Sequence, residues 1–266
     1  MNKNILIILM SLALVSCGEY QQLLKSTDPE LKYTKAVEYF EKKDFMRAAT
    51  LFDEVSRYYR GTERSEEVLN YLASSYMGQK DYFSAVEYYK TYVKTYPKGK
   101  YITDARFMIG YCSYLDSPDA RLDQKSTNEA LVSFQEFLDL HPSSERVPEV
   151  NKLMDELRDK LAYKELLNSR LYFNLGNYLG NNYLAAVLTA QNALEDFPNN
   201  KYREELLFIV LQAKYEQAVQ SVPEKRVERY RDTIDEYYNF INEHPEGNYR
   251  KQADRIFNES NKVVKD

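Results

Sequence analysis

The sequence has no tryptophan, only two cysteines, and just eight glycines and eight prolines in 266 residues. Because glycine and proline most often interrupt regular structure, their scarcity favours long helices joined by few turns. Tyrosine is abundant instead, with 25 copies. We expect it to supply much of the large apolar volume between helices. Cys112 lies in an apolar segment, and we interpret it as a small core residue.

Charge and motif content argue against nucleic-acid binding and against catalysis. The net charge of −5 leaves no basic footprint of the kind that phosphate backbones require. The chain has no zinc-protease, CxxC, phosphate-loop or nucleophile-elbow motif. His141 and His244 each precede a proline, which indicates a shared structural position. We therefore predict no catalytic residue, no metal site, no cofactor and no enzymatic activity.

One block of sequence, residues 81–101, recurs along the chain. An alanine is followed twelve residues later by a proline in three copies: Ala85 and Pro97, Ala130 and Pro142, Ala186 and Pro198. Two further copies are incomplete, because one keeps Ala48 without the proline and the other has Thr233 in place of the alanine before Pro245. Related blocks at regular intervals indicate a repeat architecture.

Each block has the pattern of an amphipathic helix that ends at its proline. In the block that ends at Pro97, apolar residues recur at helical spacing: Ala85, Val86, Tyr89, Tyr92 and Val93. We expect the small alanine to lie where a neighbouring helix comes close, since a larger side chain would overpack that contact. The proline ends the helix because it lacks an N–H and restricts the residue before it.

A second helix precedes each block, and the pair resembles a known repeat. The pair that ends at Pro97 reads Leu69-x2-Leu72-Ala73-x2-Tyr76, then Ala85-x3-Tyr89, then the proline. Related spacings occur in two other pairs: Ala36, Tyr39, Ala48 and Phe52 in one, and Gly110, Ala130 and Phe134 in the other. This resembles the tetratricopeptide pattern W-x2-L-G-x2-Y, A-x3-F, P. The predicted fold is all-α, a tetratricopeptide-repeat superhelix of about five helix-turn-helix repeats with a C-terminal capping helix.

The predicted helices follow from this register. Repeats one and two pair Glu30–Lys42 with Phe45–Tyr59, and Glu63–Gln79 with Tyr82–Tyr96. Repeat three pairs Ile102–Leu115 with a helix that begins at Ser126, and repeat four pairs a long helix from about Val147 to Tyr178 with Tyr183–Phe197. Repeat five pairs Arg203–Ser221 with Arg226–His244, and the capping helix is Arg250–Val264. Residues 116–126 interrupt the third repeat. This insertion either forms a binding loop at the rim of the solenoid or is inert.

The first residues resemble the signal peptide of a bacterial lipoprotein. A short basic start precedes the apolar run Ile5–Val15, which is too short to span a bilayer. It ends in Leu14-Val15-Ser16-Cys17-Gly18, which resembles a lipobox. We therefore expect a signal peptide over residues 1–16, lipidation at Cys17 and a lipidated tether over 17–28. Repeats one to three would occupy 29–142, and repeats four and five with the cap 143–266.

The whole pattern resembles the BamD family of lipoproteins from the outer-membrane β-barrel assembly machinery. Its most specific stretch is Leu157–Pro198, where Lys160-Leu161-Ala162-Tyr163 on a long helix precedes Tyr172-Phe173, Gly180, Ala186-Val187 and Phe197-Pro198. The resemblance implies a non-enzymatic scaffold in the outer membrane, lipid-anchored and facing the periplasm. It implies two partners: a barrel subunit with periplasmic domains at the C-terminal repeats, and unfolded barrel precursors at the N-terminal repeats.

Repeat register also predicts a peptide groove on the first helices of repeats one to three. Its nine residues are Tyr33, Val37, Phe40, Asn70, Ser74, Met77, Phe107, Tyr111 and Tyr114. The competing interpretation is that several of them simply pack against the adjacent helix.

Two other kinds of protein stay open as alternatives. One is a periplasmic tetratricopeptide adaptor of another cell-envelope complex, although no sustained heptad run occurs here. The other is a glycan-capture lipoprotein, which would need aromatic platforms rich in the tryptophan that this chain lacks.

Overall fold

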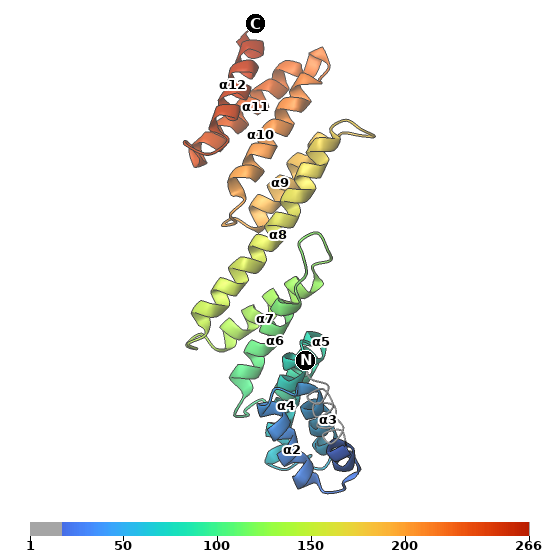
Figure 1. Cartoon of the computed structure of the whole chain (residues 1–266). Helices are drawn as coiled ribbons and strands as arrows, with labels where there is room; N and C mark the ends of the chain where they lie inside the picture. Colours follow the sequence, from blue (N-terminus) through green and yellow to red (C-terminus); the bar gives the residue numbers. More distant parts are fainter. Residues whose placement is uncertain (1–17, 266) are drawn as a thin grey trace, which may run out of the picture. The chain divides into compact units, whose positions relative to one another are not determined.

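The computed structural model describes residues 18–265, which form helices and contain no strand (Figure 1). The chain divides into two compact units, one ending at Val147 and the other beginning at Pro148, with Pro118–Gln124 belonging to the second. Within each unit the helices pair in antiparallel fashion, as tetratricopeptide repeats do. The predicted all-α tetratricopeptide fold is confirmed.

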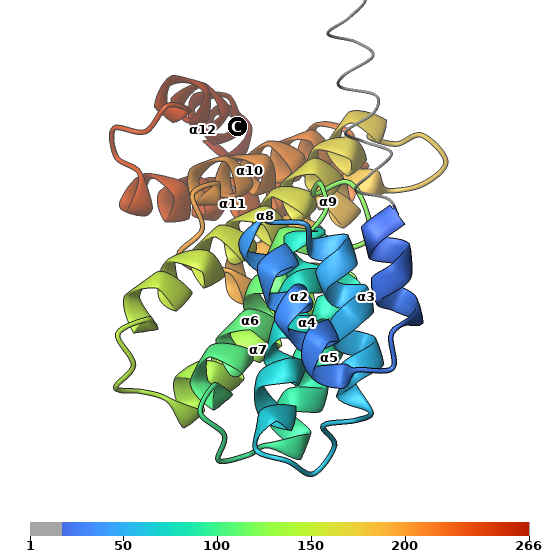
Figure 2. The ribbon, with the colours of Figure 1, turned by 60° about the horizontal axis from the view of Figure 1, so that its bottom comes forward.

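The first unit holds three helix pairs, which follow one another from blue to green in Figures 1 and 2. They are α2 (Pro29–Glu41) with α3 (Phe45–Ser56), α4 (Arg64–Gly78) with α5 (Tyr82–Thr95), and α6 (Ile102–Asp116) with α7 (Lys125–Leu140). Each helix packs mainly against its neighbours in the sequence. This is the contact pattern of a solenoid, in which each repeat buries its apolar faces against adjacent repeats.

The second unit begins with the long helix α8 and ends with the cap. Its helices are α8 (Val147–Leu175), α9 (Asn182–Asp196), α10 (Arg203–Val219), α11 (Pro223–Glu243) and α12 (Arg250–Lys265). Leu166 of α8 packs with Ala186, Ala190 and Leu206 in one core cluster. Phe208 and Leu211 of α10 pack with Phe240 and Ile256 in the next. The predicted boundaries therefore hold to within a few residues.

Small residues sit where paired helices meet. Ala48, Ala85, Ala130 and Ala186 are fully buried, and so is Thr233 at the fifth position of the series. Thr233 is tolerated because its hydroxyl donates to the carbonyl of Arg229 at 2.8 Å. At Gly110 no side chain fits at all, since a Cβ atom there would lie 2.6 Å from the ring of Phe134.

Caps and prolines fix where the second helices start and stop. The carboxylates of Asp44 and Asp81 accept the backbone N–H of Arg47 and Ser84 at the starts of α3 and α5. Tyr96, Phe197 and His244 end their helices with nearly the same backbone angles, φ between −124° and −130°, each before a proline. His141 and His244 also share one contact, because each ring packs on the phenylalanine four residues earlier. Their shared structural position is confirmed.

The predicted tether contains structure. Residues 18–25 form a helix, not an extended link, and Leu23 is buried in the first core cluster. Tyr20 packs edge-on against Tyr39 at 5.8 Å, and the guanidinium of Arg47 lies 5.0 Å from the centre of the Tyr20 ring. The periodicity analysis missed this helix because it spans barely two turns and starts next to the leader.

The insertion is anchored more firmly than a free loop would be. At its base, the hydroxyls of Ser117 and Thr127 lie 2.6 Å apart, and Ser126 donates to Asp116 at 2.6 Å. Within the second unit, Lys164 of α8 donates to the carbonyl of Leu122 at 2.8 Å. The insertion thus forms hydrogen bonds both at its base and at Leu122.

Tyrosine hydroxyls tie the cap to its neighbours. Tyr215 of α10 donates to Glu259 of α12 at 2.5 Å, and Tyr237 of α11 donates to Asp254 at 2.8 Å. Burial, followed by the bond to Glu259, raises the pKa of Tyr215. The bond from Tyr215, together with Arg255, holds the pKa of Glu259 below its ordinary value of 4.5.

We predict that Tyr215→Phe loosens α12. The cost is about 1 kcal/mol at pH 7, because the lost hydrogen bond goes to a charged group that is partly exposed to solvent. A lowered carboxyl pKa stabilises the fold above pH 4.5 and loses that effect as the pH falls through the folded-state value. The difference between variant and parent should therefore shrink below pH 4.5, as measured by hydrogen exchange of α12 amides.

The matched control is Tyr238→Phe. Tyr238 is about half exposed, and its hydroxyl forms no hydrogen bond with other described residues. Equal loosening of α12 in both variants, or a difference that grows in acid, would contradict the role given to Tyr215.

Candidate peptide-binding surface

The nine predicted groove residues fall on α2, α4 and α6 of the first unit. Phe107 is buried at 3% exposure, and the other eight are partly buried. None of the nine is fully exposed. Each therefore has neighbours in the fold, and these neighbours decide what it can offer a ligand.

Tyr33 lies in a cluster of rings and one cation. Its ring meets those of Phe52 and Tyr59 edge-on, at 6.2 and 5.8 Å between centroids. The guanidinium of Arg64 lies 4.7 Å from the centre of the Tyr33 ring. Burial, followed by a hydrogen bond to Glu67, raises the pKa of Tyr33. The hydroxyl therefore stays neutral and the ring serves mainly in packing.

Phe40 and Val37 belong to the same core, with a partner that the sequence analysis missed. The rings of Phe40 and Tyr71 lie 5.0 Å apart, and Tyr71 stacks on Phe52 at 5.1 Å. Val37 packs against the same buried cluster. Tyr71 directly follows Asn70 in the sequence. The residue that contacts Phe40 is therefore the next one along the chain from the predicted groove residue.

Ser74 has a structural partner. Its hydroxyl lies 3.0 Å from that of Tyr89, which is buried on α5. Burial raises the pKa of Tyr89 to about 12. Because this buried phenol needs a polar neighbour, the Ser74 hydroxyl is committed to the fold. Met77 packs at the edge of the same cluster without such a bond.

The third set forms a row of rings along α6. Phe107 stacks on Tyr111 at 5.5 Å, and Tyr111 on Tyr114 at 6.1 Å. The guanidinium of Arg146 lies 4.3 Å from the centre of the Phe107 ring and pairs with Asp104 at 3.1 Å. Phe107 is thus covered, while Tyr111 and Tyr114 are partly buried. Of the nine residues, Met77, Tyr111 and Tyr114 fit the groove hypothesis best.

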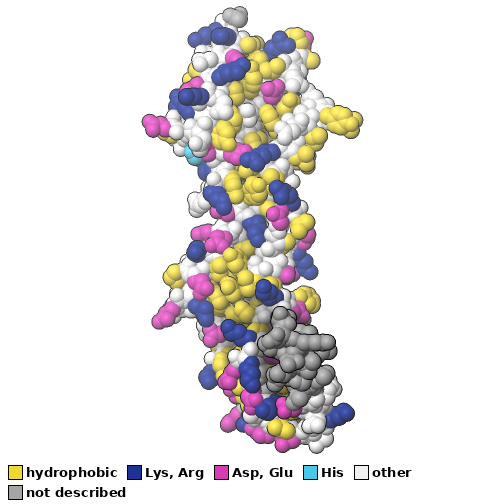
Figure 3. Space-filling model, in the orientation of Figure 1, with side chains coloured by type: hydrophobic (Ala, Val, Ile, Leu, Met, Phe, Trp, Pro, Cys, Tyr) yellow, Lys and Arg dark blue, Asp and Glu magenta, His cyan; other side chains and the backbone are white. Residues whose placement is uncertain are grey.

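A further hollow of this unit, with a mainly apolar lining, lies elsewhere. It encloses about 620 Å³ and is lined by α5, α6 and α7, with none of the nine predicted residues among its walls. The face drawn in Figure 3 mixes charges of both signs, because Lys and Arg side chains alternate with Asp and Glu without a field of one sign. That pattern does not suit a phosphate backbone.

Metal ligands, the free cysteine and helix hydropathy each bear on what the described residues can do. Among residues 18–265, no group of three or more His, Cys, Asp and Glu side chains is placed to hold a metal ion. Burial raises the pKa of the Cys112 thiol to about 12, which keeps it protonated and unreactive. No helix in this part of the chain has the length and apolarity that crossing a bilayer requires. Cys17, the predicted lipidation site, lies outside the described residues.

Comparison with known proteins decides the family. The family model YfiO, described as "Outer membrane lipoprotein", matches residues 25–214. The chain belongs to this family. The matched range contains all nine predicted groove residues and the segment Leu157–Pro198, and it ends inside α10. The cap and α11 lie beyond it.

Two curated relatives carry the name that the resemblance predicted. "Outer membrane protein assembly factor BamD" of Caulobacter vibrioides is 24% identical over 69% of this chain, and the match spans only 59% of that protein. The protein of the same name from Neisseria meningitidis is 23% identical over 79% of this chain and 83% of its own length. The resemblance to the BamD family is confirmed.

A solved structure gives a weaker similarity. The TPR2AB domain of yeast Sti1, solved in complex with pHSP90, covers 88% of this YfiO-family chain and 98% of its own, with 12% identity and a TM-score of 0.41. No conclusion about ligands follows from a similarity of that size.

Proposed function

We propose that this YfiO-family chain is a non-enzymatic scaffold of the machinery that assembles β-barrel proteins in the outer membrane. The observation that carries the proposal is the family match over residues 25–214, with relatives named as outer membrane protein assembly factors. The described fold supports it, because stacked helix pairs offer extended surfaces for other proteins rather than an enclosed reaction site.

The anchor is Cys17, lipidated and inserted into the inner leaflet so that the repeats face the periplasm. Because residues 18–25 already form a helix packed on the first repeat, a lipid on Cys17 would hold that repeat within a few residues of the membrane surface. A contour of about 3.5 Å per residue limits the separation. The scaffold would thus sit close to the membrane rather than at the end of a long tether.

Two partners follow from this role. The C-terminal repeats would dock a barrel subunit that has periplasmic domains, and the N-terminal repeats would receive unfolded barrel precursors. Partly buried rings at Tyr111 and Tyr114 suit the second task, since ring faces bind aromatic and aliphatic side chains of an extended peptide at low entropic cost.

The proposal is tested by purifying the tagged lipoprotein from its own membranes in mild detergent. We expect an outer-membrane barrel protein with repeated periplasmic domains to co-purify in near-equal amount, identified by mass spectrometry. Recovery of peptidoglycan enzymes in its place would favour the cell-envelope adaptor.

The lipid anchor is tested separately with Cys17→Ser. A variant chain that still fractionates with the outer membrane would contradict the anchor.

The precursor surface is tested by Met77→Ala combined with Tyr111→Ala. We expect the double variant to bind peptides from the ends of barrel strands about tenfold more weakly, because it loses apolar area that only a ligand would cover fully. Affinity is measured by fluorescence polarisation.

Ser74→Ala is the matched control on the same face. Its hydroxyl already pairs with Tyr89, so this change should lower the free energy of unfolding by about 1 kcal/mol without weakening peptide binding. Unchanged affinity in the double variant would remove the α4–α6 face as the precursor site.

A further inference from the structure

The hollow on the opposite side of α6 from the tyrosine row is an apolar slot with a basic rim. Its floor contains Val93, Ile109 and Phe137, from α5, α6 and α7 respectively. Val132, at the edge of the slot, is 60% exposed. A volume of about 620 Å³ lies within the range of roughly 300–1,000 Å³ that is typical of ligand sites. All of its walls belong to the first unit.

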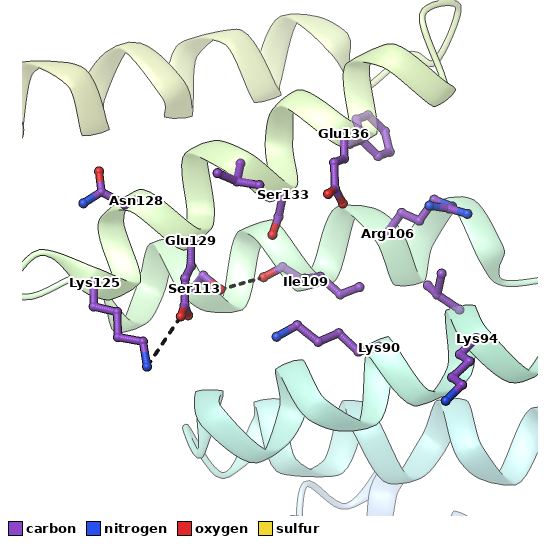
Figure 4. A pocket seen from close by; sticks show the side chains of 13 residues that line it. Lys90, Lys94, Arg106, Ile109, Ser113, Lys125, Asn128, Glu129, Ser133 and Glu136 are labelled. Atoms are coloured by element: carbon purple, nitrogen blue, oxygen red, sulfur yellow. Dashed lines mark hydrogen bonds and ion pairs between the residues drawn. The ribbon is translucent and has the colours of Figure 1, made fainter. Parts of the chain in front are cut away.

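Cations outnumber carboxylates around this slot. Four of its lining residues are basic (Lys90, Lys94, Arg106 and Lys125) and two are acidic (Glu129 and Glu136). Figure 4 shows Lys90 and Lys94 rising from α5 on one side, and Ser133 and Glu136 coming from α7 on the other. Lys90 pairs with Glu87 and Lys125 with Glu129, whereas Lys94 and Arg106 form no ion pair with other described residues. The rim therefore favours a negatively charged partner.

The second unit has a hollow at the same place in its repeat. It lies among α9, α10 and α11 and encloses about 350 Å³. The α5 and α6 positions recur 101 residues later: Lys90 as Gln191, Val93 as Leu194, Arg106 as Leu207 and Ile109 as Val210. The α7 positions recur 103 residues later, with Ser133 as Glu236 and Glu136 as Asn239. The two hollows can therefore be compared residue by residue.

Two of the positions that differ between them lie at the centre of each hollow. In the second unit, Lys214 and Glu236 form an ion pair in which the Glu236 side chain is only 7% exposed. In the first unit the corresponding residues are Ser113 and Ser133, and the Ser113 hydroxyl turns away to the carbonyl of Ile109 at 3.0 Å. An ion pair occupies these positions beside the smaller hollow, whereas two small side chains occupy them beside the larger one.

We propose that the open slot between α5 and α7 is a docking site for an amphipathic helix of a partner protein. The helix would insert aliphatic side chains against Val93, Ile109 and Val132 and carry Asp or Glu at the flanks facing Lys90, Lys94 and Arg106. This surface is distinct from the precursor-binding face on α4 and α6, and the inference does not rest on the proposed function.

The walls of the slot decide between a helix and an extended peptide. α5, α6 and α7 pair their own backbone groups internally, so the slot offers no unpaired edge to which an extended strand could add. An extended segment would bury its own N–H and C=O groups without partners, at a cost of desolvation. A helix satisfies those groups itself and presents side chains at i, i+3, i+4 and i+7.

The test uses the complete mature chain and two labelled peptides of about 18 residues, long enough to form a helix. Both carry leucine at i, i+3, i+4 and i+7, and one has glutamates where the other has lysines. We expect the acidic peptide to bind at least tenfold more tightly at low salt, with an affinity that falls as salt is added. Equal binding of the two peptides, or no binding of the acidic one, would overturn the proposal.

The second unit supplies the decisive variant. Ser113→Lys with Ser133→Glu transplants the ion pair of the second-unit hollow without changing net charge, and it should weaken binding of the acidic peptide at least tenfold. Thr91→Glu with Thr95→Lys places the same two charges on exposed positions of α5 outside the slot and should leave binding unchanged. Equal affinities in parent and transplanted variant would place the peptide elsewhere.

A charge reversal keeps the test decisive if the transplanted pair disturbs folding. Lys90→Glu with Lys94→Glu changes only exposed residues and should reverse the preference between the two peptides.

In cells, a photo-crosslinking residue at Val132 should capture a helical segment with acidic flanks, identified by mass spectrometry. Crosslinks to a second copy of this chain, to an extended barrel precursor or to lipid alone would contradict the assignment.

Discussion

The close approach of paired helices at a buried small residue is the constraint on which the rest of the structure depends. Ala48, Ala85, Ala130 and Ala186 have no exposed surface, and each lets its helix lie directly against the partner helix of the repeat. That contact fixes which face of the helix looks inward and which is left for other molecules. Where threonine replaces alanine, at position 233, its hydroxyl returns to the helix backbone, so the close packing survives.

Tyrosine carries out a second structural task that tryptophan could not perform in the same way. The rings fill the space between helices, while the hydroxyls reach carboxylates of neighbouring elements. Tyr59 pairs with Glu30, and Tyr215 with Glu259. The fully buried Tyr92 donates to Glu66 and accepts the N–H of Tyr101 at 2.9 Å. Each such tyrosine is an apolar body with a polar tip, a combination suited to surfaces between stacked repeats.

Much of this fold could be predicted from the sequence because its rules are local. The alanine-to-proline spacing located the second helix of each repeat, and a proline fixes the backbone of the residue before it whatever lies around it. The helix over residues 18–25 was missed since it is short and stable only against α2 and α3. Its burial depends on tertiary contacts that no pattern of its own reveals.

The candidate sites were harder to predict, because a helical face does not reveal its neighbours. Repeat register correctly placed Tyr111 and Tyr114 on α6, yet it could not show that Ser74 is engaged by Tyr89 or that Arg146 covers Phe107. The open slot was invisible for a related reason. Ser113 and Ser133 are unremarkable in the sequence, and they gain meaning only beside the ion pair of Lys214 and Glu236.

The central claim is that this YfiO-family chain serves barrel assembly, and depletion tests it most directly. The chain is placed under a repressible promoter, and the outer-membrane proteome is quantified as the protein disappears. The account predicts that folded β-barrel proteins fall together, before growth stops, while other lipoproteins of the same membrane keep their levels. Barrel proteins that stay at normal abundance after the chain is gone would contradict it.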